Sequence, residues 1–355
     1  MKHNPRDKRF AIDRDIRDRI VRGVYPPGSR LPVRVELERE FRVSSNTMQH
    51  ALDLLIQDGY VIPCGREGTF VSERPPCFSR IALIFPEPEE EAVGQNQFYR
   101  AFRNELNHVS ERMNLSFQLI DGVALLGNFN KINALFSDIR ERRLAGMIFL
   151  AVPRCFADTP LVDAPDVARV AISNSFVFNI PAVWVDYLGF YRKAIAHLAQ
   201  EGCRRPAFLV DPYSLETFLE FAAEELPRHG LPFCRRLIQE VHLTSSRGLE
   251  NLVELLFAPD NPERPDSLVV GDDNRLSLIT ARLKELGFYG PNSIKIVSLA
   301  NFPWPTTSHL PVFRIGFDVS QILQLCAELL IRQAKGEAVQ EITMLPALYE
   351  HEIQL

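Results

Sequence analysis

Short, unbroken runs of apolar residues alternate with longer amphipathic segments from residue 80 to about residue 335. The runs are RIALIF (80–85), LSFQLI (115–120), AGMIFLA (145–151), VARVAI (167–172), RPAFLV (205–210), RLIQEV (236–241), DSLVV (266–270) and IKIVSL (294–299). Because an unbroken apolar run suits a strand buried on both faces, these runs predict parallel strands. The helical patterns between them, for instance at 98–113, 191–202 and 276–287, predict a doubly wound α/β fold. Two similar lobes fit the number of runs better than one oversized sheet.

The first 72 residues follow a different pattern, that of three short helices. The second helix is expected to open at Leu31-Pro32, the third follows Ser44 as its N-cap, and Gly59 suits a left-handed C-terminal cap. The apolar positions expected to face inward are Ile12, Ile16, Ile20, Val35, Leu37, Phe41, Met48, Ala51, Leu52, Leu54 and Leu55. The second and third helices read as a helix–turn–helix.

Two short β-rich runs, YVIPC and TFVS, flank the turn GREG at 65–68 and predict a hairpin, or wing. Pro75-Pro76 then interrupts regular structure before the first apolar run. We therefore expect a winged helix–turn–helix domain at 1–72, a linker at 73–79, a two-lobed domain at 80–340 and a C-terminal tail at 341–355.

Charge is divided unevenly along the chain. Residues 1–75 carry 14 Lys and Arg against 11 Asp and Glu, whereas the remainder carries 26 against 34. A mildly basic head permits a polyanion partner but does not by itself demand one. The six cysteines form no CxxC or Cys/His cluster, so neither a disulfide framework nor a metal site is expected. With no apolar stretch long enough for a membrane span or a secretory signal, a cytoplasmic location is expected.

Polar side chains follow several of the predicted strands. In open α/β sheets ligands bind beyond the carboxyl ends of the strands, so these positions are candidate ligand contacts. They are Pro86-Glu87, Asp121-Gly122, Ser173-Asn174, Asp211, Asp272-Asp273-Asn274 and Asn301, and Trp184 lies on a further short run, AVWV. Asp and Asn with one aromatic ring suit a hydroxyl-rich ligand. The alternative is that each Asp or Asn merely caps a turn or helix.

Motifs typical of enzymes are absent. The sequence has no GxGxxG, GxxxxGK[ST], GxSxG or HExxH, and its histidines show no metal-like spacing. Asp272 and Asp273 could act as acid and base, but adjacent side chains diverge, which favours a helix cap beside one ligand contact. We expect no catalysis, no cofactor and no metal.

The head closely resembles the DNA-binding domain of the gluconate-repressor (GntR) family. The segment GVYPPGSRLPVRVELEREFRVSSNTMQHALDLLIQDGYV, followed by GTFV, carries this resemblance over 23–71. Val35, Ser45 and Gln49 stand where the family usually has basic residues. The resemblance implies contacts with double-stranded DNA from Arg30, Arg34, Ser44, Ser45, Asn46, Thr47, Gln49, His50, Arg66, Gly68 and Thr69.

Two interpretations of that departure remain open. Gln49 and neighbouring polar residues at a helix N-terminus can still bind phosphate and read adenine edges, with nearby arginines supplying charge. DNA binding would then be retained, with a shifted sequence preference and a dependence on dimerisation. Alternatively the head has lost DNA binding.

The body resembles the effector domain of the lac-repressor type, which is similar to periplasmic sugar-binding proteins. The segments NQFYRAF (96–102), RRLAGMIFL (142–150), VWVDYLGFYRKAIAHLAQEGCRRPAFLV (183–210), DSLVVGDD (266–273) and GFYGPNSIKIVSLAN (287–301) carry it. Head and body together resemble the arabinose-repressor-like subgroup. Phe218 stands near the place of the usual ligand-gripping Arg. The resemblance implies effector contacts from Phe98, Tyr99, Asp121, Ser173, Trp184, Phe218, Asp272 and Asn301.

These observations predict a homodimeric transcription regulator, more often a repressor than an activator in such families. A small molecule, expected to be a sugar or sugar derivative, would bind between the two lobes and change how the two heads fit DNA. The alternatives are a regulator without an effector, or a small-molecule-binding or interaction module whose head is degenerate.

Overall fold

The computed structural model describes residues 5–86, 96–122, 129–150, 161–162, 167–173, 179–211, 215–241 and 245–353. The chain divides into two compact units. The first unit comprises Met1–Pro88, His108–Ala182 and Cys326–Glu341, and the second comprises Glu89–Asn107, Val183–Leu325 and Ile342–Leu355. The chain contains two six-stranded sheets, and the first unit also contains the head.

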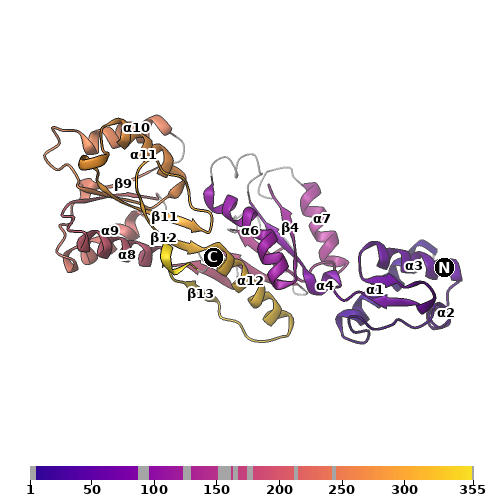
Figure 1. Cartoon of the computed structure of the whole chain (residues 1–355). Coiled ribbons are helices and arrows are strands. Elements are labelled where there is room, and N and C mark those ends of the chain that lie inside the picture. The colour runs from indigo at the N-terminus through magenta and orange to yellow at the C-terminus, as the bar shows by residue number, and fades with distance from the viewer. Residues whose placement is uncertain are drawn as a thin grey trace. The chain divides into compact units, whose positions relative to one another are not determined.

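The head consists of three helices and a hairpin, in the order expected for a winged helix. The elements are α1 (Pro5–Val21), α2 (Arg34–Phe41), α3 (Ser45–Gln57), β1 (Val61–Pro63) and β2 (Thr69–Val71), with a 3-10 turn at Gly65–Glu67. The three helices lie together at the indigo end of the ribbon (Figure 1). Their core is the predicted stripe of Ile12, Ile16 and Ile20 packed with Met48 and Leu55.

Helix α2 begins later than the sequence suggested. Val33 is its extended N-cap residue, and the Glu36 carboxylate accepts a hydrogen bond from the Val33 amide at 3.1 Å. The expectation that Val35 faces inward was wrong, because its side chain is 50% exposed while Leu37 is buried. The cap predicted at Gly59 is confirmed by its φ of +78°.

A short helix follows the head, and the first six-stranded sheet begins directly after it. The elements of this part are α4 (Pro76–Ser79), β3 (Arg80–Ile84), α6 (Gln97–Met113), β4 (Ser116–Ile120), α7 (Phe129–Arg140), β5 (Gly146–Leu150), β6 (Ala168–Ile172), β7 (Ala182–Val185), α12 (Val319–Ala334) and β13 (Ile342–Leu345). The strand order is β13-β7-β6-β5-β3-β4, and the pairs from β6 to β4 are parallel. The predicted linker therefore contains one helical turn.

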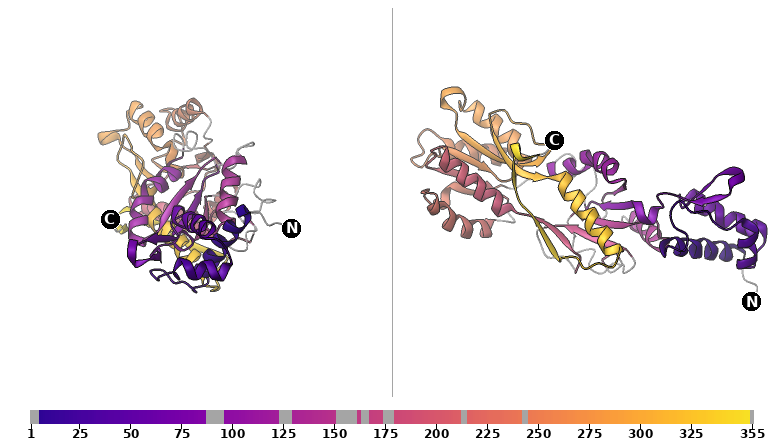
Figure 2. Two further views of the ribbon diagram at one scale, coloured as in Figure 1. Left: turned by 90° about the vertical axis from the view of Figure 1, so that its right-hand side faces the viewer. Right: turned by 60° about the horizontal axis from the view of Figure 1, so that its bottom comes forward.

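The second sheet has the strand order β14-β12-β11-β10-β8-β9. Its elements are α8 (Tyr187–Gln200), β8 (Pro206–Val210), α9 (Leu215–Arg228), β9 (Ile238–Glu240), α10 (Ser246–Phe257), β10 (Ser267–Val270), α11 (Leu276–Glu285), β11 (Lys295–Phe302), β12 (Phe313–Asp318) and β14 (Leu348–Tyr349). The pairs from β9 to β12 are parallel, and only β14 pairs antiparallel to its neighbour. Helices α8 and α9 cover one face and α10 and α11 the other (Figures 1 and 2).

Every predicted apolar run contains a strand, which confirms the doubly wound α/β fold. The sequence analysis did not identify β12, whose run is interrupted by Arg314 and Gly316. It also took residues 341–355 for a tail, whereas β13 and β14 belong to the two sheets. No helix in the described ranges is long and apolar enough to cross a membrane.

Gly316 lies where the backbones of β11 and β12 approach closely, and its substitution tests that close packing. A Cβ atom at this position would lie 1.8 Å from the carbonyl oxygen of Ala300, and neither backbone can move without breaking the sheet. We predict that Gly316→Ala lowers the free energy of unfolding by about 3 kcal/mol or more, at the upper end for an overpacked core.

Gly202→Ala is the control, because a Cβ there meets no atom within 4 Å and only the left-handed φ of +80° opposes it. That change should cost roughly 1–2 kcal/mol. Urea unfolding of both variants measures the difference, and equal costs would contradict the packing argument.

Candidate DNA-binding and effector sites

The predicted reading face lies on the first two turns of α3. Ser44 is the N-cap, its hydroxyl oxygen accepting a hydrogen bond from the Thr47 amide at 3.4 Å. Ser45, Asn46 and His50 are exposed, whereas Met48 points into the core. The start of α3 therefore presents hydroxyl, amide and imidazole groups to solvent beside the free amides of a helix N-terminus, a combination that suits a phosphate backbone.

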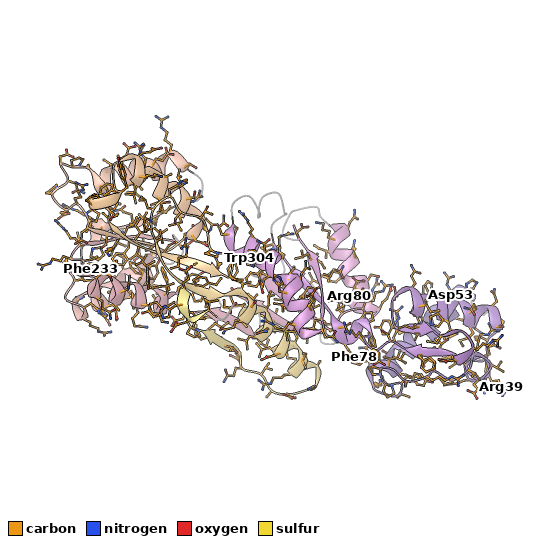
Figure 3. The ribbon with its side chains drawn as sticks, viewed as in Figure 1. Arg39, Asp53, Phe78, Arg80, Phe233 and Trp304 are labelled. Carbon is orange, nitrogen blue, oxygen red and sulfur yellow. The ribbon has the colours of Figure 1, made fainter. Side chains whose placement is uncertain are left out.

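A hydrogen-bonded chain supplies a positive charge to this face. Arg34 Nη1 donates to Gln49 Oε1 at 3.2 Å, and Gln49 Nε2 donates to Asp53 Oδ1 at 2.8 Å. Asp53 is exposed on α3 (Figure 3). Arg34, on α2, thus stands beside the position where the family usually has a basic residue on α3. Arg34 of α2 therefore supplies a positive charge beside Gln49, where the family usually has a basic residue.

The wing carries two further cations. Arg30 precedes α2 and forms an isolated antiparallel β-bridge with Phe70 of β2. A Cβ atom added to Gly68 would lie 2.7 Å from Nε of Arg30. Gly68 also has a φ of +110°, a conformation that side chains rarely adopt. Arg66 is exposed at the tip of the wing. The head thus places Arg34 beside α3, and Arg30 and Arg66 at the wing.

The second unit gathers polar groups at the carboxyl ends of β10 and β11. Asp272 and Asp273 directly follow β10, and Asn301 lies near the end of β11. Asn301 Nδ2 donates to Asp273 Oδ2 at 2.9 Å, and Thr306 Oγ1 donates to the same oxygen at 3.2 Å. Asp272 Oδ1 accepts from the Asn274 amide at 3.0 Å.

Burial changes the acidity of this pair. Desolvation, reinforced by the neighbouring Asp272 carboxylate, raises the pKa of Asp273 to about 7. Desolvation also raises the pKa of Asp272. In the described part of the chain, Asp272 Oδ2 and Asp273 Oδ1 have no side-chain hydrogen-bond donor. Asp272 is half-buried, so its Oδ2 can accept a hydrogen bond from a hydroxyl or amino group of a ligand, whereas Asp273 is 2% exposed.

Two tyrosines of α8 border the acidic pair. Tyr191 is 2% exposed, and its hydroxyl fits against Gly271, where a Cβ would lie only 2.0 Å from it. Burial, with contributions from Asp211 and Asp272, raises the pKa of Tyr191, and burial likewise raises that of Tyr187. Both phenols therefore keep their protons and remain hydrogen-bond donors at neutral pH.

A polar cavity of about 140 Å³ opens beside Thr306. Its walls are Gln97, Arg100, Ala101 and Asn104 of α6 and the segment 304–307 that follows β11. Trp304, which is 38% exposed, donates its indole N–H to Glu105 at 2.9 Å (Figure 3). The Gln97 amide donates to Asn274 Oδ1 at 2.6 Å, which links the start of α6 to the acidic pair.

The structure separates the predicted effector residues. Asp272 and Asn301 lie together at the edge just described, and Phe98 lies in the first turn of α6, half-buried against Phe102. Phe218 is fully buried between Tyr191 and Phe208 in the core, so its side chain is out of reach of a ligand. The expectation of an effector contact from Phe218 therefore conflicts with its position.

The remaining predicted residues are spread over both units. Tyr99 is buried, and Trp184 is half-buried on β7 with its indole N–H unpaired within the described residues. Asp121, at the end of β4, is paired with Lys131, and Ser173 is half-buried after β6. The candidates Glu87 and Asn174 lie outside the described residues.

The sequence analysis missed Tyr187, Tyr191, Thr306 and Trp304. The tyrosines are spaced i, i+4 in the first turns of a helix that follows a strand, and such a helix starts at the ligand edge of the sheet. The other two follow β11 by two and four residues. Reading a few residues further past each strand would have found them. Across the described ranges, no group of three or more His, Cys, Asp or Glu side chains could hold a metal ion.

Comparison with known proteins identifies both parts of the chain. Residues 10–71 match the family described as bacterial regulatory proteins, gntR family, and residues 195–350 match the periplasmic binding protein-like domain. No curated protein sequence matches the chain.

Similar solved structures share the fold of the body. A transcriptional regulator LacI from Bacillus cereus subsp. cytotoxis NVH 391-98 is 17% identical, with a TM-score of 0.59 over 77% of this chain and 96% of that chain. The transcriptional regulator CelR in complex with cellobiose is 18% identical, with a TM-score of 0.57 over 86% and 90%. A LacI family regulator from Enterococcus faecium with bound ribose is 17% identical, with a TM-score of 0.55 over 77% and 97%.

The two matching families are described as bacterial regulatory proteins and as a periplasmic binding protein-like domain, and the edge at Asp272 and Asp273 offers hydrogen-bonding groups. The chain therefore joins a head that matches the gntR family of bacterial regulatory proteins to a body that matches the periplasmic binding protein-like domain and shares its fold with LacI-type regulators of known structure.

Proposed function

We propose that the protein is a repressor that binds operator DNA as a homodimer and responds to a small hydroxyl-rich effector, a sugar or sugar derivative. The observation that carries this proposal is the pairing of an exposed polar helix start in the head with an acceptor-rich edge in the body. Binding to a chromosomal operator would place the protein in the cytoplasm. The effector changes the relative placement of the two heads, and hence their fit to two half-sites.

The head supports sequence-specific binding despite its departures from the family. An amide such as Gln49 can bind adenine through two hydrogen bonds in the major groove, and His50 adds a second base-reading group. Arg30, Arg34 and Arg66 neutralise phosphates, which carries much of the affinity but little of the specificity.

The edge at Asp272 and Asp273 supports a neutral effector with several hydroxyl groups. Free carboxylate oxygens accept hydrogen bonds from such hydroxyls, and the phenols of Tyr187 and Tyr191 complete a polar rim. The positive groups near it are Arg275, beside Asp272, and Arg100 in the cavity wall. The carboxylates of Asp211 and Asp272 repel one another and would also repel an anionic ligand at this edge. The solved structures of similar fold include regulators with bound cellobiose and ribose.

We predict that Gln49→Ala weakens binding to the preferred operator by about 1–3 kcal/mol and relaxes the preference at one base position. Selection from random double-stranded DNA identifies the operator, and gel-shift titration measures the affinities. The side chain of Gln57 lies on the same helix and is exposed, so Gln57→Ala is the matched control and should leave both affinity and preference unchanged.

A selection that enriches no sequence, together with binding that does not weaken as salt rises, would contradict the proposal that the head reads DNA. It would favour the alternative in which the body is a binding module with a degenerate head.

We predict that Asp272→Ala weakens effector binding at least tenfold, since a hydrogen bond to a charged group contributes about 1.5–3 kcal/mol. Calorimetry against neutral mono- and oligosaccharides, with their phosphate esters alongside, identifies the effector class. The neutral sugars should bind and the phosphate esters should not. Asp260→Ala removes an exposed carboxylate elsewhere in the second unit and serves as the control. A flat panel with DNA binding intact would indicate a regulator without a sugar effector.

The buried Asp273 should make stability depend on pH. Its pKa is about 7 in the folded chain against an ordinary 3.8, so the folded state holds a proton that the unfolded state releases. The stabilisation from that proton is complete below pH 4 and is lost as pH rises to 7. Asn can accept the same hydrogen bonds without a charge. Relative to wild type, Asp273→Asn should therefore gain roughly 2–4 kcal/mol between pH 5 and pH 8.

Chemical denaturation across this pH range tests the prediction. The difference between variant and wild type is the quantity of interest, because it removes the contribution of all other titrating groups. A difference that stays constant from pH 5 to pH 8 would show that Asp273 titrates normally.

A further inference from the structure

A buried arginine in the head has one hydrogen-bond partner that the head does not supply. Arg17, on α1, is 1% exposed although its guanidinium is always charged. Its Nε and Nη2 donate to Asp13 Oδ1 at 2.9 and 2.8 Å, and Nη2 also donates to Asp58 at 2.5 Å. Its Cζ lies 4.6 Å from the centre of the Tyr60 ring. Nη1 donates to the carbonyl oxygen of Glu141, 124 residues away, at 2.9 Å.

Glu141 opens the turn between α7 and β5, and the next two residues also bind the head. Arg142 Nε pairs with Asp18 at 2.5 Å, and the Tyr60 hydroxyl donates to the Arg142 carbonyl. Arg143 Nε donates to Asp58 at 2.9 Å. Three consecutive residues of one turn therefore contact α1, the end of α3 and the start of the wing.

These contacts join charged side chains of the head to charged side chains of the turn at 141–143. Arg17 and Arg143 share the Asp58 carboxylate, and Arg143 is held in turn by Asp138 and Glu141 of its own lobe. Separating the head from the turn would break the bond from Arg17 to the Glu141 carbonyl, the ion pair of Arg142 with Asp18 and the bond from Arg143 to Asp58. We call the set Asp13, Arg17, Asp58, Tyr60 and residues 141–143 the clasp.

The connection between head and lobe leaves little free chain. Pro76 of α4 is buried, and Cys77 packs against the core of the head. The Ser79 hydroxyl donates to the Pro75 carbonyl at 3.0 Å, and β3 begins at Arg80, the next residue. The segment expected to be a linker is therefore itself packed in place.

We propose that the clasp fixes the DNA-binding head rigidly on the first lobe, so that the body sets the direction in which α3 meets DNA. The consequence for DNA rests on the proposed function, whereas the rigidity does not. The clasp also gives the body a route to the head. Helix α7 ends at the clasp, and near its start Lys131 Nζ donates to the carbonyl oxygen of Asp121 at 3.0 Å, at the carboxyl end of β4.

The proposal is tested on the full chain by removing the two charged side chains that the lobe contributes, which leaves the bonds from Arg17 and Tyr60 to the backbone carbonyls of Glu141 and Arg142 in place. Arg142→Met/Arg143→Met keeps the side-chain bulk, leaves Arg17 paired with Asp13 and Asp58, and does not touch the reading face of α3. Tyr60→Phe is a milder variant that removes one hydrogen bond and keeps every ion pair. Arg140, the last residue of α7 in the same lobe, is exposed, so Arg140→Met is the matched control.

Nuclear magnetic relaxation of backbone amides measures how the head tumbles. In the wild type and in Arg140→Met, amides of α3 should have the rotational correlation time of the amides of β5. In the double variant the correlation time of the head should fall at least twofold, and in Tyr60→Phe it should fall in the same direction by less. A wild-type head that already tumbles faster than β5 would overturn the proposal, as would a double variant whose head still tumbles with the lobe.

Binding to selected DNA tests the consequence separately. A DNA with two half-sites requires both heads in register, whereas a single half-site does not. The double variant should bind the two-site DNA at least tenfold more weakly and the single half-site less than twofold more weakly. Equal losses on both DNAs would show that orientation is not what the clasp provides. If the wild type binds neither DNA, the proposed function fails, but the relaxation experiment still decides whether the clasp holds the head.

Discussion

Burial of parallel strands on both faces governs where this protein can carry chemistry. Strands β8, β10 and β11 are lined by apolar side chains in the core, and their peptide groups are paired with neighbouring strands. The two buried hydroxyls in these strands bond locally, Ser267 to Asp266 and Ser298 to the Leu299 carbonyl. The remaining polar side chains of these strands are Lys295, at the start of β11, and Asn301, one residue before its end, so ligand-binding groups stand where the strands end. Asp272, Asp273 and Asn301 are placed by that constraint.

A related constraint applies to the head, because its small core can hold a buried charge only when the hydrogen-bond donors of that charge have partners. Arg17 is the charge in question, and the body completes its bonding. Helix α3 connects this arrangement to function, since its first turns carry Ser45 and Gln49 while its C-terminal end leads into Asp58. Its 13 residues span about 20 Å, so a contact at one end orients the other. The reading face and the clasp are opposite ends of one rigid element.

Much of the fold was predictable because its signals are local and periodic. The Ile12, Ile16 and Ile20 stripe, the Ser44 cap and the apolar strand runs each specify an element within a few residues. Val35 was misplaced because an apolar residue on a short helix does not itself say which face is buried. The strand β12 was missed because Arg314 and Gly316 interrupt its apolar pattern.

The sites were less predictable because they depend on contacts between distant residues. The strand ends pointed to Asp272 and Asn301, and Asn301 donates to Asp273, the residue after Asp272, but nothing local to Phe218 shows that it lies in the core. The bond from Arg17 to Glu141 spans 124 residues, and no periodicity in α1 distinguishes Arg17 from the exposed Arg14 three residues earlier. The predicted linker looked free for the same reason, since its partners are in the head core.

The departures of the head from its family and the clasp explain one another. A head on a loose tether loses rotational freedom each time it docks, and strong charge contacts usually offset that loss. Gln49 and His50 offer directional hydrogen bonds in place of such contacts, and they contribute only when the helix already lies at the correct angle to the groove. In the proposed arrangement, a head held by Arg17, Tyr60 and the turn at 141–143 has already lost this rotational freedom before it binds DNA. For the DNA reader proposed above, weak, directional contacts are then sufficient.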